Sequence, residues 1–321
     1  MQAYPIKFSP ILKEKIWGGE KLSNILNKTS DSKNLGESWE ISGVEDNISM
    51  VSNGLYKGKS LNDLIKSYKC EFLGKDNIAA FGENFPLLIK FLDAKTSLSV
   101  QVHPDDEMAK ANHNAFGKTE MWYIMDSDDN AEIVLGLKEN DLDKNVLGDI
   151  NASNVNAIFN TEKVKQGDSY FIPAGKIHAI GAGVLAAEIQ QTSDITYRVY
   201  DWDRTDTNGR QRDLHTAAAI KATKSFPSNG KRNYQLEADK TSNLVDCDFF
   251  TTNIFEVKSN QKRDYRNLDS FVIFMCVEGT TEVTIGNKTE IVAMGETILI
   301  PANTDAVTFN SEGSKLLEVF I

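Results

Sequence analysis

The chain has 321 residues, 40% hydrophobic and 25% charged, which is typical of a soluble globular protein with room for two domains. Its net charge of −11 argues against nucleic-acid binding, which relies on basic surfaces. The three cysteines show no CxxC spacing, and neither a secretory signal nor a long apolar run is present. We therefore expect a cytoplasmic protein that does not bind membranes.

Short strands and one helix are predicted at the N-terminal end. Pro and Gly break residues 1–59 into brief apolar stretches, which favours strands joined by turns. Trp17 and Trp39 lie in this part, and we interpret both as packing residues. Ser60 begins an apolar-periodic helix with a capping-type pair, and Gly74 is expected at its end.

A polar face is predicted for the strand at residues 97–103. Apolar residues alternate there with Ser99, Gln101 and His103, so these three polar side chains share one face. Pro104 ends the strand, and the acids after it favour the start of a helix.

Two neighbouring strands carry further charged residues. The apolar stretch PLLIKFLDAK contains Lys90 and Lys95, and we interpret Lys95 as exposed. The stretch KTEMWYIM reads as a strand in which Lys118 and Glu120 share one face.

A metal site is the hypothesis that unites the polar residues. Residues 167–181 predict a short strand, a Pro-Ala-Gly turn and a second strand that begins at His178. Borderline divalent metals such as zinc bind imidazole nitrogen and carboxylate oxygen, and catalytic sites use about three protein ligands. His103, Glu120 and His178 supply that set, with the Gln101 amide oxygen as a weaker fourth ligand.

The remaining elements are predicted as follows. The polar stretch at 138–160 is expected to hold one short helix, and 181–204 a strand, a bend and another strand. Residues 212–223 are helical by composition. His215 on this helix is interpreted as a packed or capping residue and His113 as solvent-facing, which leaves two of the four histidines for a metal.

Four motifs together resemble the type I mannose-6-phosphate isomerases in their short bacterial form. They are QVHPDDE, GKTEMWYI, GDSYFIPAGKIHAIG and EIQQTSDITYRVYDWDR, in that order along the chain. The resemblance covers most of the chain to about residue 220. It implies a metal-dependent isomerase that interconverts mannose 6-phosphate and fructose 6-phosphate. The reaction moves a proton between C1 and C2 through an enediolate.

The resemblance also implies roles for individual residues. Lys90 and Ser99 would bind the phosphate end of the substrate, and the motif E-x5-D-x3-R places Glu188, Asp194 and Arg198 in the active site. Arg198, a fixed cation, suits charge stabilisation.

The group that removes the C2 proton stays open at this point. Lys118 is suited to ring opening or proton shuttling. Glu188, Asp194, Lys118 and a metal-bound water are the candidates for the base. Asp201, Asp203 and Arg204 are interpreted as a surface ion-pair ladder.

An internal repeat indicates the architecture. The pattern GDSYFIPAGKIHAI at 167–180 returns as GETILIPANTDAVT at 295–308, where Ala306 takes the position of His178. We expect a mainly β protein of two cupin-type jelly-roll domains with a few short helices. Residues 1–240 would form the metal-binding domain, and 241–321 a degenerate domain without a metal site.

Two other functions remain open from the residues alone. Two histidines and a carboxylate also describe non-haem iron oxygenases, and cupins host both chemistries. The third hypothesis is a sugar-phosphate binding protein without catalysis. A small sugar phosphate is the expected partner, and nothing indicates an obligate protein partner. The sequence leaves open the oligomeric state and the metal used in the cell.

Overall fold

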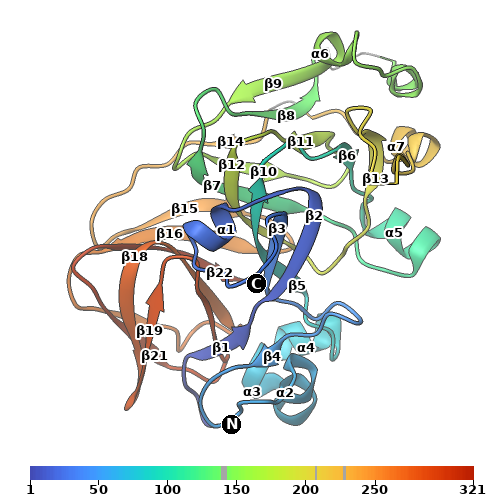
Figure 1. Ribbon diagram of the computed structural model, residues 1–321. Coiled ribbons are helices and arrows are strands. Elements are labelled where there is room, and N and C mark those ends of the chain that lie inside the picture. The colour runs from blue at the N-terminus through green and yellow to red at the C-terminus, as the bar shows by residue number, and fades with distance from the viewer. Residues whose placement is uncertain (139–142, 207, 227–228) are drawn as a thin grey trace.

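The computed structural model describes residues 1–138, 143–206, 208–226 and 229–321, and it is built mainly of antiparallel strands (Figure 1). These strands form three sheets. The seven-stranded sheet has the order β14 (Lys231–Arg232), β10 (Ser169–Ile172), β7 (Glu120–Ser127), β12 (Val184–Gln191), β5 (Leu87–Ala94), β3 (Leu35–Ile41) and β2 (Ile11–Gly19). The five-stranded sheet has the order β13 (Tyr197–Tyr200), β6 (Val100–Val102), β11 (His178–Ile180), β8 (Glu132–Leu137) and β9 (Phe159–Lys163).

The third sheet has ten strands and belongs mostly to the C-terminal part. Its main path is β15 (Thr241–Asp246), β16 (Thr251–Val257), β22 (Ser314–Phe320), β18 (Val272–Ile285), β20 (Thr297–Ile300), β1 (Ile6–Ser9) and β4 (Met50–Val51). Three more strands extend it, namely β17 (Gln261–Asp264), β19 (Lys288–Ala293) and β21 (Ala306–Asn310).

The seven-stranded sheet is the central layer, because buried apolar side chains cover both of its faces. On β12, Leu185 and Ile189 pack into a core shared with Ile273 of the ten-stranded sheet. Val184 and Ala186 point the other way, into a core shared with the five-stranded sheet. This alternation follows from the two-residue period of a strand. It also turns every second side chain of β12 and β7 toward the five-stranded sheet, and that is where the polar residues lie.

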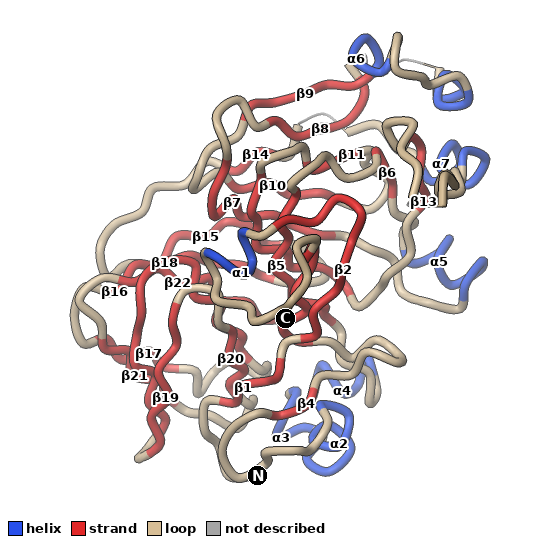
Figure 2. The backbone as a smooth tube through the Cα atoms, viewed as in Figure 1, coloured by secondary structure: helices blue, strands red, loops and turns tan. Residues whose placement is uncertain are grey.

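Helices are short, and most of them lie at the periphery in Figure 2, whereas α1 lies near its centre. They are α1 (Lys21–Asn24), α2 (Leu61–Tyr68), α3 (Cys70–Leu73), α4 (Lys75–Phe81), α5 (Asp106–His113), the 3-10 helix η1 (Lys144–Gly148), α6 (Val155–Ile158) and α7 (Thr216–Ala222). The stretch at 138–160 thus holds two short helical segments among its described residues rather than one; its residues 139–142 lie outside the described ranges. No described helix is long and apolar enough to span a bilayer.

The helix predicted after Ser60 begins as expected but is interrupted. Ser60 and Asp63 form a capping box at the start of α2. The helix ends at Tyr68 because Lys69 takes a positive φ of 43°, and the chain continues as α3 to Gly74. A Cβ at Gly74 would lie 2.1 Å from the carbonyl oxygen of Asp269, so glycine is required there for a close approach to the C-terminal part.

The internal repeat returns as matching strands. β10 and β11 of the first copy correspond in sequence to β20 and β21 of the second, with Ala306 in place of His178 at the start of the last strand. The predicted fold, mainly β with a cupin domain, is confirmed. The boundary near residue 240 stays a prediction, and the N-terminal strands β1 and β4 join the ten-stranded sheet through β20.

Candidate metal centre and active-site pocket

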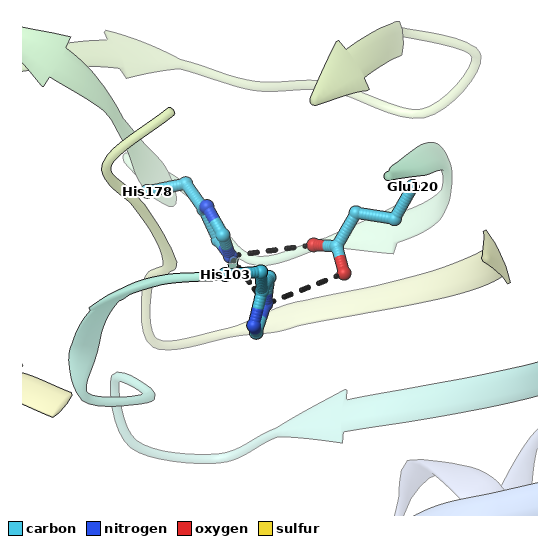
Figure 3. A group of neighbouring side chains, drawn as sticks. All are labelled: His103, Glu120 and His178. Atoms are coloured by element: carbon cyan, nitrogen blue, oxygen red, sulfur yellow. Dashed lines mark hydrogen bonds and ion pairs between the residues drawn. The ribbon is translucent and has the colours of Figure 1, made fainter. Parts of the chain in front are cut away.

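Three predicted ligands from the five-stranded and seven-stranded sheets meet at the ends of their strands (Figure 3). His103 directly follows β6, while Glu120 and His178 are the first residues of β7 and β11. Their ligand atoms all lie within 4.8 Å of one another, and all three side chains are buried. The Nε2 atoms of the two histidines lie 3.5 and 3.3 Å from the oxygens of Glu120. The group can hold a metal ion.

Backbone carbonyls fix the orientation of both imidazoles. His103 Nδ1 donates to the carbonyl of Ile195, and His178 Nδ1 to that of Lys176, each at 2.8 Å. A carbonyl only accepts, so the proton sits on Nδ1 and the Nε2 lone pair faces the site. Burial, aided by the nearby Lys118 ammonium, lowers the pKa of His103 well below its usual value and that of His178 to about 3. Both rings are therefore neutral, as a metal ligand requires.

Several contacts show that a cation fits here. The two Nε2 atoms lie 3.1 Å apart with lone pairs facing each other. Glu120 Oε1 is buried without a hydrogen-bond partner, and burial raises the pKa of this carboxyl group although Lys118 opposes the rise. A divalent ion between these atoms would satisfy the lone pairs and the buried oxygen together.

Gln101 and Lys118 lie beside the group formed by the three predicted ligands. The Gln101 amide nitrogen lies 3.5 and 3.4 Å from Nε2 of His103 and His178. A half turn of the Gln101 side-chain amide would direct its oxygen toward the two histidines, where it could bind a metal ion. The Lys118 ammonium donates to His103 Nε2 at 3.0 Å and also contacts Glu120 Oε2.

A pocket of about 280 Å³ opens beside these residues and gathers the remaining predicted site residues. Its predicted members are Lys90, Ser99, Gln101, Lys118, Glu188, Asp194 and Arg198. Four of them lie on β5, β6, β12 and β13, Ser99 and Lys118 shortly precede β6 and β7, and Asp194 lies between β12 and β13. The motifs therefore converge in space although they are far apart along the chain.

Buried ion pairs form one wall of the pocket. Lys90 Nζ lies 3.3 Å from Glu188 and 3.9 Å from Glu37, and over the Trp39 ring. Burial favours a lower pKa for Lys90, but the two carboxylates outweigh it and raise the pKa. For Glu188 burial acts upward, but Lys118 and Lys90 outweigh it, so its pKa is lowered. Both groups are thus charged, and the Trp122 indole donates to Glu188 at 3.1 Å.

Arginines lie at the pocket opposite this wall. Arg198 pairs across strands with Gln101, and its Nη1 donates to the Asp213 carbonyl at 2.7 Å. Its Nε is buried and has no partner among the described residues. Arg212 also lines the pocket and donates to Asp201 through two nitrogens at 2.8 and 2.6 Å.

The interpretation of Asp201 as part of a surface ion-pair ladder was wrong. Asp201 is buried and bonds Arg204 at 2.5 Å as well as Arg212. Its location follows from its place directly after β13, beside the pocket, where its carboxylate anchors an arginine that lines the site.

Three charged lining residues were not predicted, namely Lys15, Glu37 and Arg212; Trp17, interpreted as a packing residue, also lines the pocket. Glu37 lies two residues before Trp39 on β3, so the alternation of that strand was a usable signal for its inward orientation. Lys15 and Arg212 showed no such sequence signal. They reach the pocket from β2 and from a loop, because the fold brings these distant segments to it.

The other two histidines lie apart from the metal group. His215 precedes α7 and its Nδ1 accepts from the Arg198 backbone at 3.1 Å. His113 is exposed at the end of α5, and its Nε2 contacts the Tyr197 hydroxyl at 2.8 Å.

Comparisons with known proteins place the chain among mannose-6-phosphate isomerases. The chain matches the family "Phosphomannose isomerase type I, catalytic domain" over residues 6–142 and "Mannose-6-phosphate isomerase, cupin domain" over 240–319. It is 36% identical to mannose-6-phosphate isomerase ManA of Bacillus subtilis, with 94% of each chain covered. It is 33% identical to the Streptococcus mutans mannose-6-phosphate isomerase, over 97% of this chain and 96% of the other. The crystal structure of a Bacillus subtilis mannose 6-phosphate isomerase superposes with a TM-score of 0.88 at 35% identity, covering 100% of both chains. From its site and these likenesses, the chain belongs to the type I phosphomannose isomerase family.

Proposed function

We propose that this enzyme interconverts mannose 6-phosphate and fructose 6-phosphate at the pocket beside His103, Glu120 and His178. The observation that carries the proposal is the charge of the pocket. In a chain of net charge −11, five cationic side chains line it against three carboxylates, namely Lys15, Lys90, Lys118, Arg198 and Arg212 against Glu37, Glu188 and Asp194. A local cluster of this kind attracts an anionic sugar phosphate that the whole protein would repel.

The resident metal would be zinc. Two neutral imidazoles and one carboxylate are a donor set that zinc accepts, with Gln101 as a fourth ligand. When bound, such an ion would polarise the substrate oxygens.

The protein's own groups perform the proton transfers. We assign the removal of the C2 proton to Glu188, which is ionised and held by the Trp122 indole, whereas Asp194 is exposed. Lys118 is placed to move the hydroxyl proton between the substrate oxygens. Arg198 stabilises the negative charge that develops on the enediolate. Ser99 and Lys90 bind the substrate, the first through its hydroxyl group and the second through its ammonium group.

The test combines metal analysis with an activity assay. Purified protein should contain about one zinc per chain and convert mannose 6-phosphate into fructose 6-phosphate without oxygen. Removal of the metal by a chelator should abolish turnover, and added zinc should restore it. Metal-loaded protein that consumes oxygen, or that binds mannose 6-phosphate without forming fructose 6-phosphate, would contradict the proposal.

A further inference from the structure

A second cavity, separate from the active site, lies beside β8 and β11. These two strands are found in the upper part of Figure 1. Its volume is about 250 Å³, and its described lining shares no residue with the active-site pocket. Its walls come from β8, from the turn that leads into β11, from η1 and from the chain after α7.

Positive charge sets this cavity apart from the rest of the molecule. Four lysines line it, and none of the described lining residues is acidic. The whole chain has 46 acidic and 35 basic residues, so the charge of this lining is opposite in sign to the net charge of the chain. The lysines are Lys138, Lys144, Lys176 and Lys224.

The cations are held by distinct parts of the fold. The Lys144 ammonium donates to the carbonyl of Thr223, and Lys224 forms an ion pair with Asp105 at 2.6 Å, outside the cavity lining. Lys176 is buried, with its ammonium 5.7 Å from the centre of the Phe226 ring. The side-chain amides of Asn160 and Asn229 also line the cavity; the amide nitrogen of Asn160 donates to the Leu135 carbonyl and that of Asn229 to Glu162, and each keeps a second hydrogen.

We propose that this cavity binds a compact phosphate-bearing anion at a site distinct from the catalytic pocket. A dianion matches several ammonium groups and amide donors, since charge-assisted hydrogen bonds to phosphate are short and strong. The volume favours a small ligand, because pockets for drug-sized molecules measure roughly 300–1,000 Å³. Inorganic phosphate and a small phosphate monoester share this chemistry.

The cavity also adjoins the metal group. Lys176 lines the cavity with its side chain, while its carbonyl accepts the hydrogen bond that orients the ligand His178. One residue therefore contributes to both sites.

A tryptophan reporter inside the cavity tests the proposal on the full metal-loaded chain. The Phe226→Trp protein is titrated with inorganic phosphate and, separately, with glycerol 3-phosphate while its fluorescence is recorded. The parent protein, titrated identically, gives the background from its four native tryptophans. We expect a saturable change beyond that background; the probe with the lower half-saturation concentration identifies free phosphate or a monoester as the better ligand.

Variants that each remove one lysine charge test whether the anion binds in this cavity. In the reporter background, Lys144→Met and Lys176→Met should each weaken binding about tenfold or more, whereas Lys221→Met, on the exposed face of α7, should not. Circular dichroism checks folding, and the half-buried Lys144 keeps the test valid if the buried Lys176 variant unfolds. A reporter signal no larger than the background, or equal responses in Lys144→Met and Lys221→Met, overturns the proposal.

Discussion

His178 and His215 differ in what surrounds their ring nitrogens. His178 directs Nε2 at Glu120 and His103, whereas His215 lies at the start of α7 and accepts from the backbone of Arg198. We expect His178→Ala to lose the bound metal, because two ligands hold a divalent ion much more weakly than three. His215→Ala should retain it. Metal content after gel filtration is measured for both variants, and comparable metal losses in the two would contradict the ligand assignment.

Arg198 contributes charge rather than metal binding. Its guanidinium is held by the carbonyl of Asp213 and lines the pocket. Arg198→Ala should therefore keep its metal while kcat falls about 10²–10³-fold, the usual cost of removing one group that stabilises developing negative charge. Steady-state kinetics measure kcat, and metal analysis measures the retained metal. Arg266→Ala, an exposed arginine of the C-terminal part, is the matched control, and a normal kcat for Arg198→Ala would remove Arg198 from the mechanism.

Asp201 gives the protein a pH-dependent part of its stability. Burial favours a higher pKa for its carboxyl group, but the hydrogen bonds of Arg212 and Arg204 outweigh burial and lower the pKa. Because the folded pKa lies below the unfolded value of about 3.9, this stabilisation is present above that pH and is lost as pH falls through the folded pKa.

The variant Asp201→Asn should therefore reduce the free energy of unfolding by about 1–3 kcal/mol at pH 7. The difference from wild type should stay constant down to about pH 5 and shrink below about pH 4. Urea unfolding at a series of pH values measures it, with the exposed Asp129→Asn as control. A difference that grows toward low pH would show that the sign of the pKa shift is wrong.

At the scale of elements, α2 depends on its N-terminal cap. Ser60 Oγ accepts from the Asp63 amide at 3.1 Å, and Asp63 accepts from the Ser60 amide at 3.0 Å. Ser60→Ala should lower the free energy of unfolding by about 1 kcal/mol. Ser67→Ala, exposed near the end of the same helix, should be neutral or slightly stabilising, since alanine is the better helix former. Equal stability changes for Ser60→Ala and Ser67→Ala in thermal unfolding would show that the cap does not specifically stabilise the helix.

Elements with strong local signals were predicted well, and those set by distant contacts were not. Alternation placed Gln101 and His103 on one face of β6, and the cap at Ser60 marked the start of α2. The break at Lys69 was missed because lysine is not a residue type that marks a positive φ. Glycine at 74 was noticed, yet its close approach to Asp269 has no local signature.

At the scale of the whole molecule, the motifs located the site but not its full lining. The three metal-group residues were predicted because imidazole and carboxylate in separated motifs point to a shared ion. Lys15 and Arg212 were missed because an isolated lysine or arginine is ordinary on any surface. The pairing of Ile6 with Leu299, which joins the first strand to the C-terminal sheet, was missed because such distant pairing leaves no trace in either segment.

That pairing and a shared core join residues 1–240 to the C-terminal part. Among the fully buried side chains of the core between the seven-stranded and ten-stranded sheets are five from the ten-stranded sheet: Ile273, Met275, Leu299, Leu317 and Val319. Each buried apolar side chain is worth about 1.5–3 kcal/mol, and their sum is comparable to the roughly 5–15 kcal/mol by which a domain is stable.

A chain of residues 1–240 alone would expose the facing apolar surface and leave β1 without β20. We expect it to aggregate or to lack fixed tertiary structure, which near-ultraviolet circular dichroism and limited proteolysis would detect. The full chain purified in the same way is the control. A soluble, protease-resistant fragment that binds one metal ion would instead show that the N-terminal part folds independently and that the shared core only joins two stable units.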